Sequence, residues 1–318
     1  MQMKILITNI ASVTAISITK ILKKGILKNI YIIGTEAQKY GYNSGSMLVD
    51  YYIQVPSVTD KSYVQSILHI CTNYDIDVVI PILDEEIYIF EKSCLRDYVK
   101  ILLPNIQTIC LFRNKMLASE RIHNFLPMNV PQIYKNKNAI NCDKVIIRKK
   151  ESIGSQGITI KEKKELSLND FNDPDCFVQT YIEGTEYTVD ILADKHGNIK
   201  LIIPRERLQI KNGVSTKVKI SKDLEIINLC QKIYDKFCIP GLSNIQFIKQ
   251  NNNIYFLELN MRFAGMGIAS VLASYDYLSD YILYLTSNKN LGNYSDNMEK
   301  VKWGVVVCRY YEETVLMQ

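Results

Sequence analysis

Apolar and polar residues alternate along residues 254–262, which is the pattern of a β-strand. The two faces of this strand are predicted to carry Tyr255, Leu257 and Leu259 on one side and Glu258, Asn260 and Arg262 on the other. A carboxylate, an amide and a guanidinium on one face would be costly to bury unless they bind something charged. The pattern therefore marks this strand as a candidate binding element.

A second strand precedes it and ends in the turn-prone cluster Asn251 to Asn253. If the two strands pair around a three-residue loop, Gln246 lies directly opposite Glu258, with Asn260 one step further along the same face. Hard cations such as Mg²⁺ prefer oxygen ligands of this kind. The alternative is that these polar side chains form only the solvated face of an edge hairpin.

Strand-like and helix-like hydrophobic patterns alternate along the N-terminal third of the chain. Short apolar runs at 3–8, 29–33 and 77–83 are separated by helical patterns at 13–25 and 61–74. This alternation predicts a parallel sheet with right-handed crossovers. The first turn has no GxGxxG motif, so a dinucleotide site is not supported.

The acidic run Asp84 to Glu86 follows the third of these strands. It fits a helix N-terminus enriched in acids, which the pattern favours, or a contact to a cationic substrate group.

The remaining elements are predicted from the same patterns. The expected helices are 110–125, 223–237 and 268–284, and the expected strands are 144–150, 176–182, 185–192 and 301–309. Residues 151–160 form a Gly/Ser loop whose backbone N–H groups could approach an anion, with Arg148 as the countercharge. The basic, hydroxyl-rich segment 205–217 is either a solvated loop or, through Arg205 and Arg207, part of the substrate surface.

Composition excludes several classes of protein. The chain has 318 residues, 47% of them hydrophobic, and a net charge of +5 without a dense basic tract, so no nucleic-acid partner is expected. Its eight cysteines include no CxxC pair and no grouping with the three histidines, which argues against zinc and for a reduced cytoplasmic protein. No apolar run is long enough to span a membrane, and no membrane partner is expected.

The order of these pieces resembles the ATP-grasp family, and within it the large subunit of carbamoyl-phosphate synthetase. The resemblance covers residues 105–285 and depends on the whole ordered set: a basic helix, the Arg148 strand, the Gly154 to Gly157 loop, the 178–186 segment and the 246–262 hairpin. It implies an α/β protein with three parts: an N-terminal parallel-sheet pre-ATP-grasp domain (1–105), a small lobe with the phosphate loop (106–178) and a large lobe with the metal site (179–318).

The resemblance also implies roles for individual residues. ATP would be bound by residues that match the family's phosphate, adenine and ribose contacts, namely Lys115, Arg148, Gly154, Ser155, Gln156, Gly157, Gln179, Thr180, Tyr181, Ile182, Glu186 and Ser215. Mg²⁺, or Mn²⁺ as a substitute, would be held by Gln246, Glu258 and Asn260, and Arg262 and Arg207 are the catalytic candidates. Arg148 departs from the family pattern, because a lysine followed by proline is usual there.

The activity implied by this resemblance is ATP-dependent ligation of two small molecules, a carboxylate and an amine. The carboxylate would be activated as an acylphosphate and then attacked by the amine or a similar nucleophile. With one grasp unit and no glutaminase, a stand-alone ligase is expected, and a homodimer is an expected assembly. Two alternatives stay open: a non-catalytic, regulatory nucleotide-binding protein, and a kinase-like use of the same site.

Overall fold

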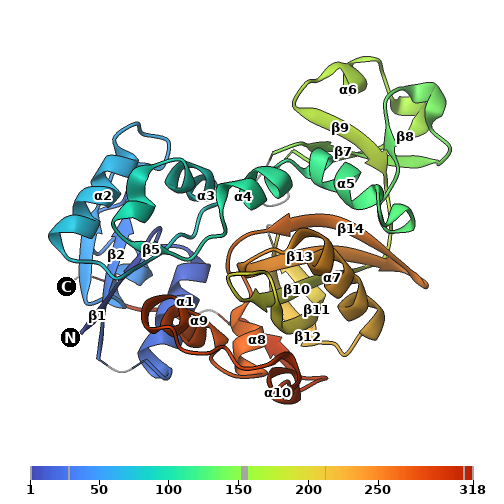
Figure 1. Ribbon diagram of the computed structural model, residues 1–318. Coiled ribbons are helices and arrows are strands. Elements are labelled where there is room, and N and C mark those ends of the chain that lie inside the picture. The colour runs from blue at the N-terminus through green and yellow to red at the C-terminus, as the bar shows by residue number, and fades with distance from the viewer. Residues whose placement is uncertain (1, 28, 152–156, 212, 311, 317–318) are drawn as a thin grey trace.

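The computed structural model describes residues 2–27, 29–151, 157–211, 213–310 and 312–316. Its N-terminal part is the predicted parallel sheet, with strand order β3-β2-β1-β4-β5 (Figure 1). The strands are β1 (Met3–Ile7), β2 (Ile30–Glu36), β3 (Tyr51–Gln54), β4 (Val78–Ile80) and β5 (Lys100–Ile101), and the helices between them are α1 (Val13–Lys24), α2 (Tyr63–Asn73) and α3 (Asp84–Glu91). The α/β class predicted from the alternation is therefore confirmed.

Two details of this sheet differ from the prediction. The second strand extends beyond the predicted run 29–33, and Gly34 lies inside β2, at a close approach where an added Cβ would stand 2.8 Å from the side chain of Val49. Strand β3 was not predicted, because only four residues form it and their side chains are exposed or half-buried. Its signal is too short to separate from a loop.

The single helix expected at 110–125 is two helices, α4 (Ile106–Arg113) and α5 (Lys115–His123). Asn114 divides them: its extended backbone ends α4, and its side-chain oxygen accepts a hydrogen bond from the Leu117 amide at 3.0 Å to cap α5. This break places Lys115 at the first position of α5. Both helices contact the edge strand β14 of the large sheet.

A small antiparallel sheet of order β6-β9-β7-β8 projects from the rest of the chain (Figure 1). It contains β6 (Ile133–Tyr134), β7 (Lys144–Lys149), β8 (Thr159–Glu162) and β9 (Cys176–Thr180), with the short helix α6 (Asn169–Asn172) beside β9. Its core is small and separate, and includes Tyr134, Val145 and Val178. Strand β9 then leads through residues 181–184 into the large sheet.

The large antiparallel sheet has the order β14-β13-β10-β11-β12-β15. Its strands are β10 (Thr185–Ala193), β11 (Ile199–Lys211), β12 (Val214–Ile220), β13 (Gly241–Gln250), β14 (Asn253–Asn260) and β15 (Val306–Cys308), and its helices are α7 (Leu224–Phe237), α8 (Ile268–Leu272), α9 (Tyr277–Ser287) and α10 (Tyr294–Glu299). Two predictions were wrong here. Residues 205–211 and 214–217 belong to the long strands β11 and β12 rather than to a loop, and residues 268–284 form two helices rather than one.

The two faces of the large sheet differ in polarity and in what packs against them. One face is apolar and packs under α7, where Val189, Ile245 and Phe256 join Ile226 and Ile233 in one core. The other face is apolar only at one end, where Leu192 and Leu201 pack in a second core that also includes Tyr277 of α9 and strands β1 and β4. Polar side chains occupy the rest of this face, which we call the polar face. This face carries the candidate site.

A buried ion pair separates the apolar and polar ends of this face. Arg205 of β11 donates from Nε and Nη2 to the two carboxylate oxygens of Asp190, at 2.7 and 2.9 Å, and Ser270 of α8 donates to the same carboxylate. Both charged side chains are buried. Sequence reasoning had assigned Arg205 to a substrate surface, which is wrong: it is enclosed and bonded to Asp190.

The β13–β14 hairpin has the predicted pairing of Gln246 with Glu258, but it reaches that register differently. The turn contains two residues rather than three, because Gln250 pairs with Asn253. A β-bulge then compensates: Phe247 pairs with Phe256 and Gln246 with Glu258, so Leu257 has no residue opposite. Between the turn and the bulge, the predicted assignment of side chains to the two faces of the strand is therefore wrong. Phe256 is fully buried, whereas Tyr255 is only half-buried.

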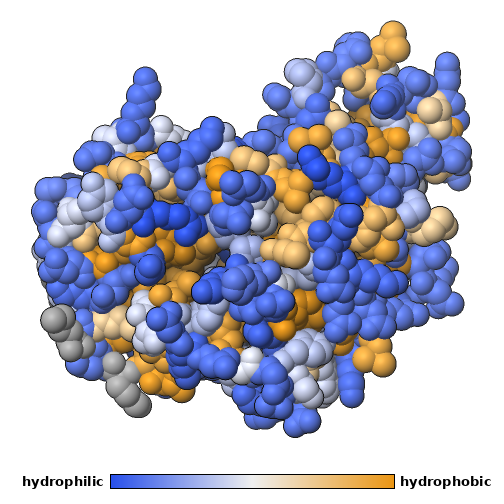
Figure 2. Space-filling model, in the orientation of Figure 1, coloured by the Kyte–Doolittle hydropathy of each residue, from blue (hydrophilic) through white to orange (hydrophobic). Residues whose placement is uncertain are grey.

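Hydrophilic side chains cover most of the molecular face drawn in Figure 2, and apolar ones gather only in small separate areas. Within the part of the chain that the structure describes, no helix is both long and apolar enough to cross a membrane.

Candidate active site

Glu258 of β14 lies between two cations contributed by other parts of the chain. Its Oε2 is 3.6 Å from Nζ of Lys115, on α5, and 3.5 Å from Nη2 of Arg148, on β7. Both cations are only 7% exposed. The site thus joins the large sheet, the small sheet and α5 through one carboxylate.

Arg148 is also bonded to the bulge. Its Nη1 donates to the carbonyl oxygen of Leu257 at 3.3 Å, so the bulged residue gains a partner from the small sheet. Burial lowers the pKa of Arg148, and the Glu258 carboxylate opposes this shift. The guanidinium remains charged, since arginine starts from a very high pKa.

Asn260 and Asn244 continue the polar face beside Glu258. The Asn260 amide nitrogen donates to Oε1 of Glu258 at 3.0 Å and lies 3.3 Å from Oδ1 of Asn244. The Asn244 amide in turn donates to the backbone oxygen of Arg262 at 3.0 Å. Asn244 was missed by sequence reasoning, although its position on β13, two residues before Gln246, puts it on the same face.

The donor set on this face fits a hard cation. Gln246 and Glu258 are directly opposed on β13 and β14, and Asn260 lies one step along, so one carboxylate and two amide groups share one face. No group of three or more His, Cys, Asp or Glu that could hold a metal occurs among the described residues. A cation held by this set would therefore depend on Glu258 as its only carboxylate.

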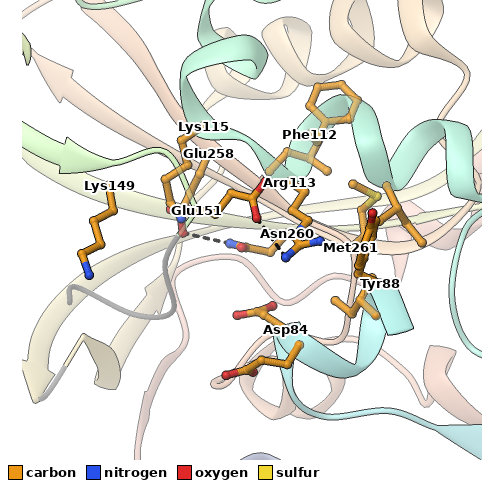
Figure 3. A pocket seen from close by; sticks show the side chains of 14 residues that line it. Asp84, Tyr88, Phe112, Arg113, Lys115, Lys149, Glu151, Glu258, Asn260 and Met261 are labelled. Atoms are coloured by element: carbon orange, nitrogen blue, oxygen red, sulfur yellow. Dashed lines mark hydrogen bonds and ion pairs between the residues drawn. The ribbon is translucent and has the colours of Figure 1, made fainter. Parts of the chain in front are cut away.

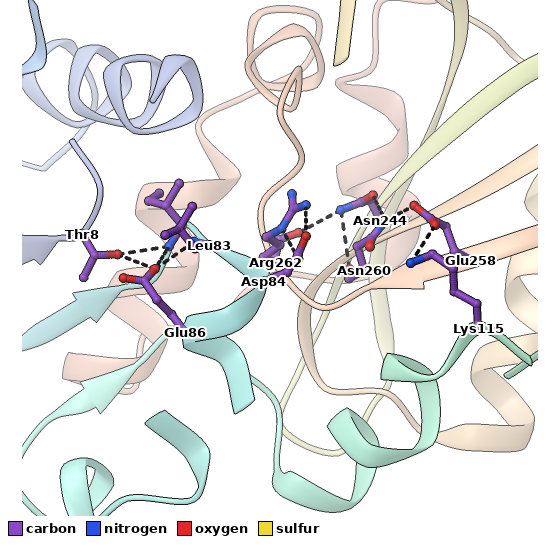
Figure 4. A network of polar contacts seen from close by, with 10 residues as sticks. Thr8, Leu83, Asp84, Glu86, Lys115, Asn244, Glu258, Asn260 and Arg262 are labelled. Atoms are coloured by element: carbon purple, nitrogen blue, oxygen red, sulfur yellow. Dashed lines mark hydrogen bonds and ion pairs between the residues drawn. The ribbon is translucent and has the colours of Figure 1, made fainter. Parts of the chain in front are cut away.

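Arg262 lies just beyond β14 and forms a bidentate ion pair with Asp84, the first residue of α3. Nε and Nη2 donate to Oδ1 and Oδ2 at 2.6 and 2.8 Å (Figure 4). Burial alone would raise the pKa of Asp84, but the charge and hydrogen bonds of Arg262 outweigh it and hold that pKa below its usual value. The N-terminal sheet thus supplies a residue that fixes Arg262.

The acidic run at 84–86 is a helix start, as the pattern favoured. α3 begins at Asp84, and the fully buried Glu86 accepts hydrogen bonds from the amides of Ile82 and Leu83 and from Thr8 (Figure 4). Burial raises the pKa of Glu86, and these donors oppose the shift. Glu86 therefore stabilises the β4–α3 junction.

Three further predicted residues form a second cluster on the polar face. Arg207 donates to Glu186 at 2.6 Å, to the hydroxyl of Ser215 at 2.9 Å and to the carbonyl oxygen of Gly213 at 2.7 Å. Burial lowers the pKa of Arg207, while Glu186 opposes that shift. The structure therefore brings Glu186, Arg207 and Ser215 together, with the arginine at their centre.

The predicted hinge follows β9, between the small and large sheets. Gln179 is buried and donates to the carbonyl oxygen of Pro131 at 2.9 Å, the hydroxyls of Thr180 and Tyr134 are 3.0 Å apart, and the Tyr181 amide donates to Lys144. Ile182 lies in the connection to β10. The side chain of Gln179 thus supports the small sheet.

The Gly/Ser loop is described only at its ends, and Gly154, Ser155 and Gln156 lie outside the described residues. Gly157 has φ +71°, and an added Cβ there would stand 2.9 Å from the Lys149 side chain. At the other end, Glu151 pairs with Arg113 of α4 at 2.9 Å. Glycine at 157 is thus required by both backbone conformation and space.

A pocket of about 390 Å³ lies between α3, α4, α5 and β14 (Figure 3). Its lining combines charged, amide and apolar side chains: Asp84, Glu85, Ile87, Tyr88, Ile109, Phe112, Arg113, Lys115, Lys149, Glu151, Glu258, Leu259, Asn260 and Met261. Three of these, Lys115, Glu258 and Asn260, were predicted site residues. Asp84 and Glu85 belong to the acidic run for which contact to a cationic substrate group was the alternative prediction, and Lys149 was not assigned.

Comparison with known proteins agrees with this geometry. Residues 172–304 match the family model described as "ATP-grasp in the biosynthetic pathway with Ter operon", and residues 5–102 match the "PylC-like, N-terminal domain". The chain is 24% identical over 262 residues to the D-alanine--D-alanine ligase of Fusobacterium nucleatum, an alignment that covers 77% of this chain and 85% of that protein.

Two further similarities concern parts of larger proteins. The arginine-specific large chain of carbamoyl phosphate synthase from Bacillus subtilis is 29% identical over 134 residues, 37% of this chain but only 13% of that one. The biotin carboxylase of Campylobacter jejuni, solved as a β,γ-ATP complex, superimposes with a TM-score of 0.73 at 16% identity, covering 95% of this chain and 74% of the other. At that identity the superposition establishes the fold.

The chain thus carries an ATP-grasp domain, matched over residues 172–304, behind a PylC-like N-terminal domain, matched over residues 5–102. It is an ATP-grasp enzyme similar to carboxylate–amine ligases, and its ATP-grasp unit is similar to that of the carbamoyl phosphate synthase large chain. The predicted family resemblance is thereby confirmed.

Proposed function

We propose that this ligase activates a small carboxylate as an acylphosphate on the polar face and transfers the acyl group to an amine. A carboxylate oxygen attacks the γ-phosphorus of ATP, and ADP leaves. The amine nitrogen then attacks the acyl carbon, phosphate leaves with the C–O bonding pair, and the nitrogen loses a proton. The observation that carries this proposal is the meeting of Lys115, Arg148 and Asn260 at Glu258.

The arrangement around Glu258 suits a site that exchanges partners when ATP binds. Without nucleotide, the carboxylate balances Lys115 and Arg148, whose charges would be costly to bury alone. A triphosphate offers these cations other negative partners, which releases Glu258 for a metal. The same side chains thus stabilise both states of the site.

Gln246, Glu258 and Asn260 would hold Mg²⁺, with Mn²⁺ as a substitute of similar ligand preference. When bound, the metal neutralises charge on the phosphate oxygens of ATP. The chain's own contribution is to aim these oxygen donors from two adjacent strands. The bulge at Leu257 determines on which face of the sheet Glu258 lies. The extra residue shifts the side chains that follow it to the opposite face of the sheet.

Arg262 would face the transferred phosphoryl group, where negative charge spreads over the oxygens. A guanidinium has five N–H donors, and Asp84 accepts two of them, from Nε and Nη2. The pair therefore fixes the plane of the guanidinium, while its remaining donors can serve an oxyanion.

The 179–182 segment would contact adenine through its backbone, and Glu186 would accept hydrogen bonds from the ribose hydroxyls. Arg207 and Ser215 hold Glu186 and the β11–β12 hairpin in place. Arg207 would thus position Glu186. A direct contact between Arg207 and substrate is a further part of the proposal. Gly154, Ser155, Gln156 and Gly157 would close over the phosphates.

Replacing Arg148 with alanine is expected to weaken ATP binding by about tenfold or more, since a charge-assisted hydrogen bond contributes roughly 1.5–3 kcal/mol. Titration calorimetry with Mg-ATP measures the effect. Lys144→Ala is a matched control, because Lys144 is an exposed cation on the same strand. An Arg148→Ala protein with wild-type ATP affinity would contradict the assignment.

The function itself is tested by a screen for ADP release. Amino acids, hydroxy acids and other small carboxylates are incubated with Mg-ATP, singly and with amines, and products are identified by mass spectrometry. We expect one carboxylate to raise ADP release and one amine to yield an amide. Phosphorylation of a substrate with no coupled amine would favour kinase-like use instead. Nucleotide binding without any turnover would favour the regulatory alternative.

The setting of the enzyme is also proposed. All eight cysteines have free thiols, which fits the reducing cytoplasm. A homodimer is proposed by analogy with dimeric biotin carboxylase domains such as that of Hydrogenobacter thermophilus. The three-part division at 105/106 and 178/179 remains a prediction. Limited proteolysis would test these boundaries, and light scattering the assembly.

A further inference from the structure

The carboxylates that line the pocket are not all paired with a cation among the described residues. Four carboxylates line it: Asp84, Glu85, Glu151 and Glu258. Three of them have a cation at ion-pair distance, because Asp84 pairs with Arg262, Glu151 with Arg113, and Glu258 with Lys115 and Arg148. Glu85 has no ion-pair partner among the described residues.

One oxygen of the unpaired Glu85 carboxylate is enclosed, although the residue as a whole is only half-buried. Its Oε2 is inaccessible to solvent and has no hydrogen-bond partner in the described part of the chain. An enclosed carboxylate oxygen without a donor is costly, so such an atom calls for an explanation. Arg262 attracts Glu85 electrostatically, but the hydrogen bonds of its guanidinium go to Asp84.

We propose that Glu85 receives an ammonium group of the organic substrate, so that the pocket selects an amine-bearing molecule. This proposal rests on the ligase function and narrows its substrate to a small organic cation. Glu85 is in the first turn of α3, next to Asp84, and it lines the same pocket as Glu258 and Asn260 of β14. Figure 3 shows Asp84, its neighbour, with these two residues. A substrate that spans the pocket would therefore reach from the ammonium at Glu85 to the site of phosphoryl transfer.

The neighbours of Glu85 favour an organic cation over a metal ion. Ile87, Phe112 and Met261 line the same pocket, and their apolar surfaces suit the methylene groups of an alkylammonium. A hard divalent cation needs about six oxygen ligands, whereas no metal-binding group of three His, Cys, Asp or Glu occurs in the described residues. Tyr88 already contacts Lys92 and Arg113, so among the described residues Glu85 is the lining carboxylate without a cation at ion-pair distance.

The test uses n-butylammonium, with n-butanol as a probe of the same chain length that lacks the charge. Ligand-observed NMR titrations measure both dissociation constants in the presence of saturating Mg-ADP. We expect wild-type protein to bind n-butylammonium about tenfold more tightly than n-butanol, which is the range of a charge-assisted hydrogen bond. Glu85→Gln should remove this preference while leaving the affinity for n-butanol unchanged.

Glu91→Gln is the matched control, because Glu91 ends the same helix and pairs with Arg96, away from the pocket. It should keep the wild-type preference. A Glu85→Gln protein that retains the preference, or a wild-type protein without it, overturns the proposal. Loss of Mn²⁺ binding by nucleotide-free Glu85→Gln, measured by electron paramagnetic resonance, would also overturn it in favour of a metal.

Nucleotide binding and ammonium binding can be tested separately. Absence of Mg-ADP binding to wild-type protein would overturn the ligase site but would leave the butylammonium titration readable without nucleotide. Melting temperatures of both variants show whether α3 is still folded, since an acid in the first turn also interacts favourably with the helix dipole. If Glu85→Gln loses the preference for n-butylammonium but keeps the wild-type melting temperature, the result supports recognition of the ammonium group by Glu85.

Discussion

Glu258→Ala is expected to abolish turnover and to remove the dependence of ATP binding on magnesium. The substitution deletes the only carboxylate among the proposed metal ligands. The amide oxygens of Gln246 and Asn260 are neutral and too weak alone to hold a hard dication against its water shell. Lys115 and Arg148 remain able to attract phosphate, so nucleotide without metal should still bind. Titrations of ATP with and without Mg²⁺ measure both effects.

Glu258→Gln is the control for shape, because it keeps the volume of the side chain and an acceptor for Asn260. It too should lose the magnesium dependence. Both variants leave Lys115 and Arg148 without their carboxylate, so a lower melting temperature is expected in each. If Mg-ATP raised the melting temperature of Glu258→Ala as much as that of the wild type, the metal assignment would be wrong.

Arg262→Ala should bind Mg-ATP almost normally but turn over about 10²–10³ times more slowly, the loss typical of one electrostatic stabiliser of a transition state. The reason is that Arg262 would interact most strongly with charge that develops during transfer. Single-turnover measurements of ADP formation, with the carboxylate found by screening, separate this step from binding.

Asp84→Asn is the informative comparison for Arg262. It keeps the guanidinium but replaces the two charge-assisted bonds that orient it with weaker ones. Its turnover should therefore fall between those of Arg262→Ala and the wild type. Equal losses of melting temperature in both variants, with turnover unchanged in each, would instead mean that the pair only joins α3 to the loop after β14.

The sequence predicted the parallel sheet and the order of the grasp elements because their signals are local. Strand runs such as 3–8 and 77–83 and the amphipathic pattern of α7 can be read within a dozen residues. The α4–α5 break was not predicted, because Asn114 is compatible with a helix as well as with a cap. The β11–β12 hairpin was not predicted either, since its hydroxyl and basic residues are those of a loop.

For the site, the pairing of Gln246 with Glu258 was predicted, but the partners from distant segments were not. The contact between Asp84 and Arg262 joins residues 178 positions apart, and no pattern along the chain encodes such a distance. Asn244 could have been found, because its face follows from that of Gln246. The roles of Arg207, Glu186 and Ser215 stay predictions, although the structure brings these side chains together.

The bulge at Leu257 has a consequence for insertions and deletions. A hairpin with a two-residue turn and one bulge presents Glu258 opposite Gln246, and a three-residue turn without a bulge would do the same. Related chains can therefore gain a residue in the turn and lose one in the strand without moving the site. Alignments that place a gap at either position describe the same arrangement, and engineered changes of turn length should be paired with a compensating change at residue 257.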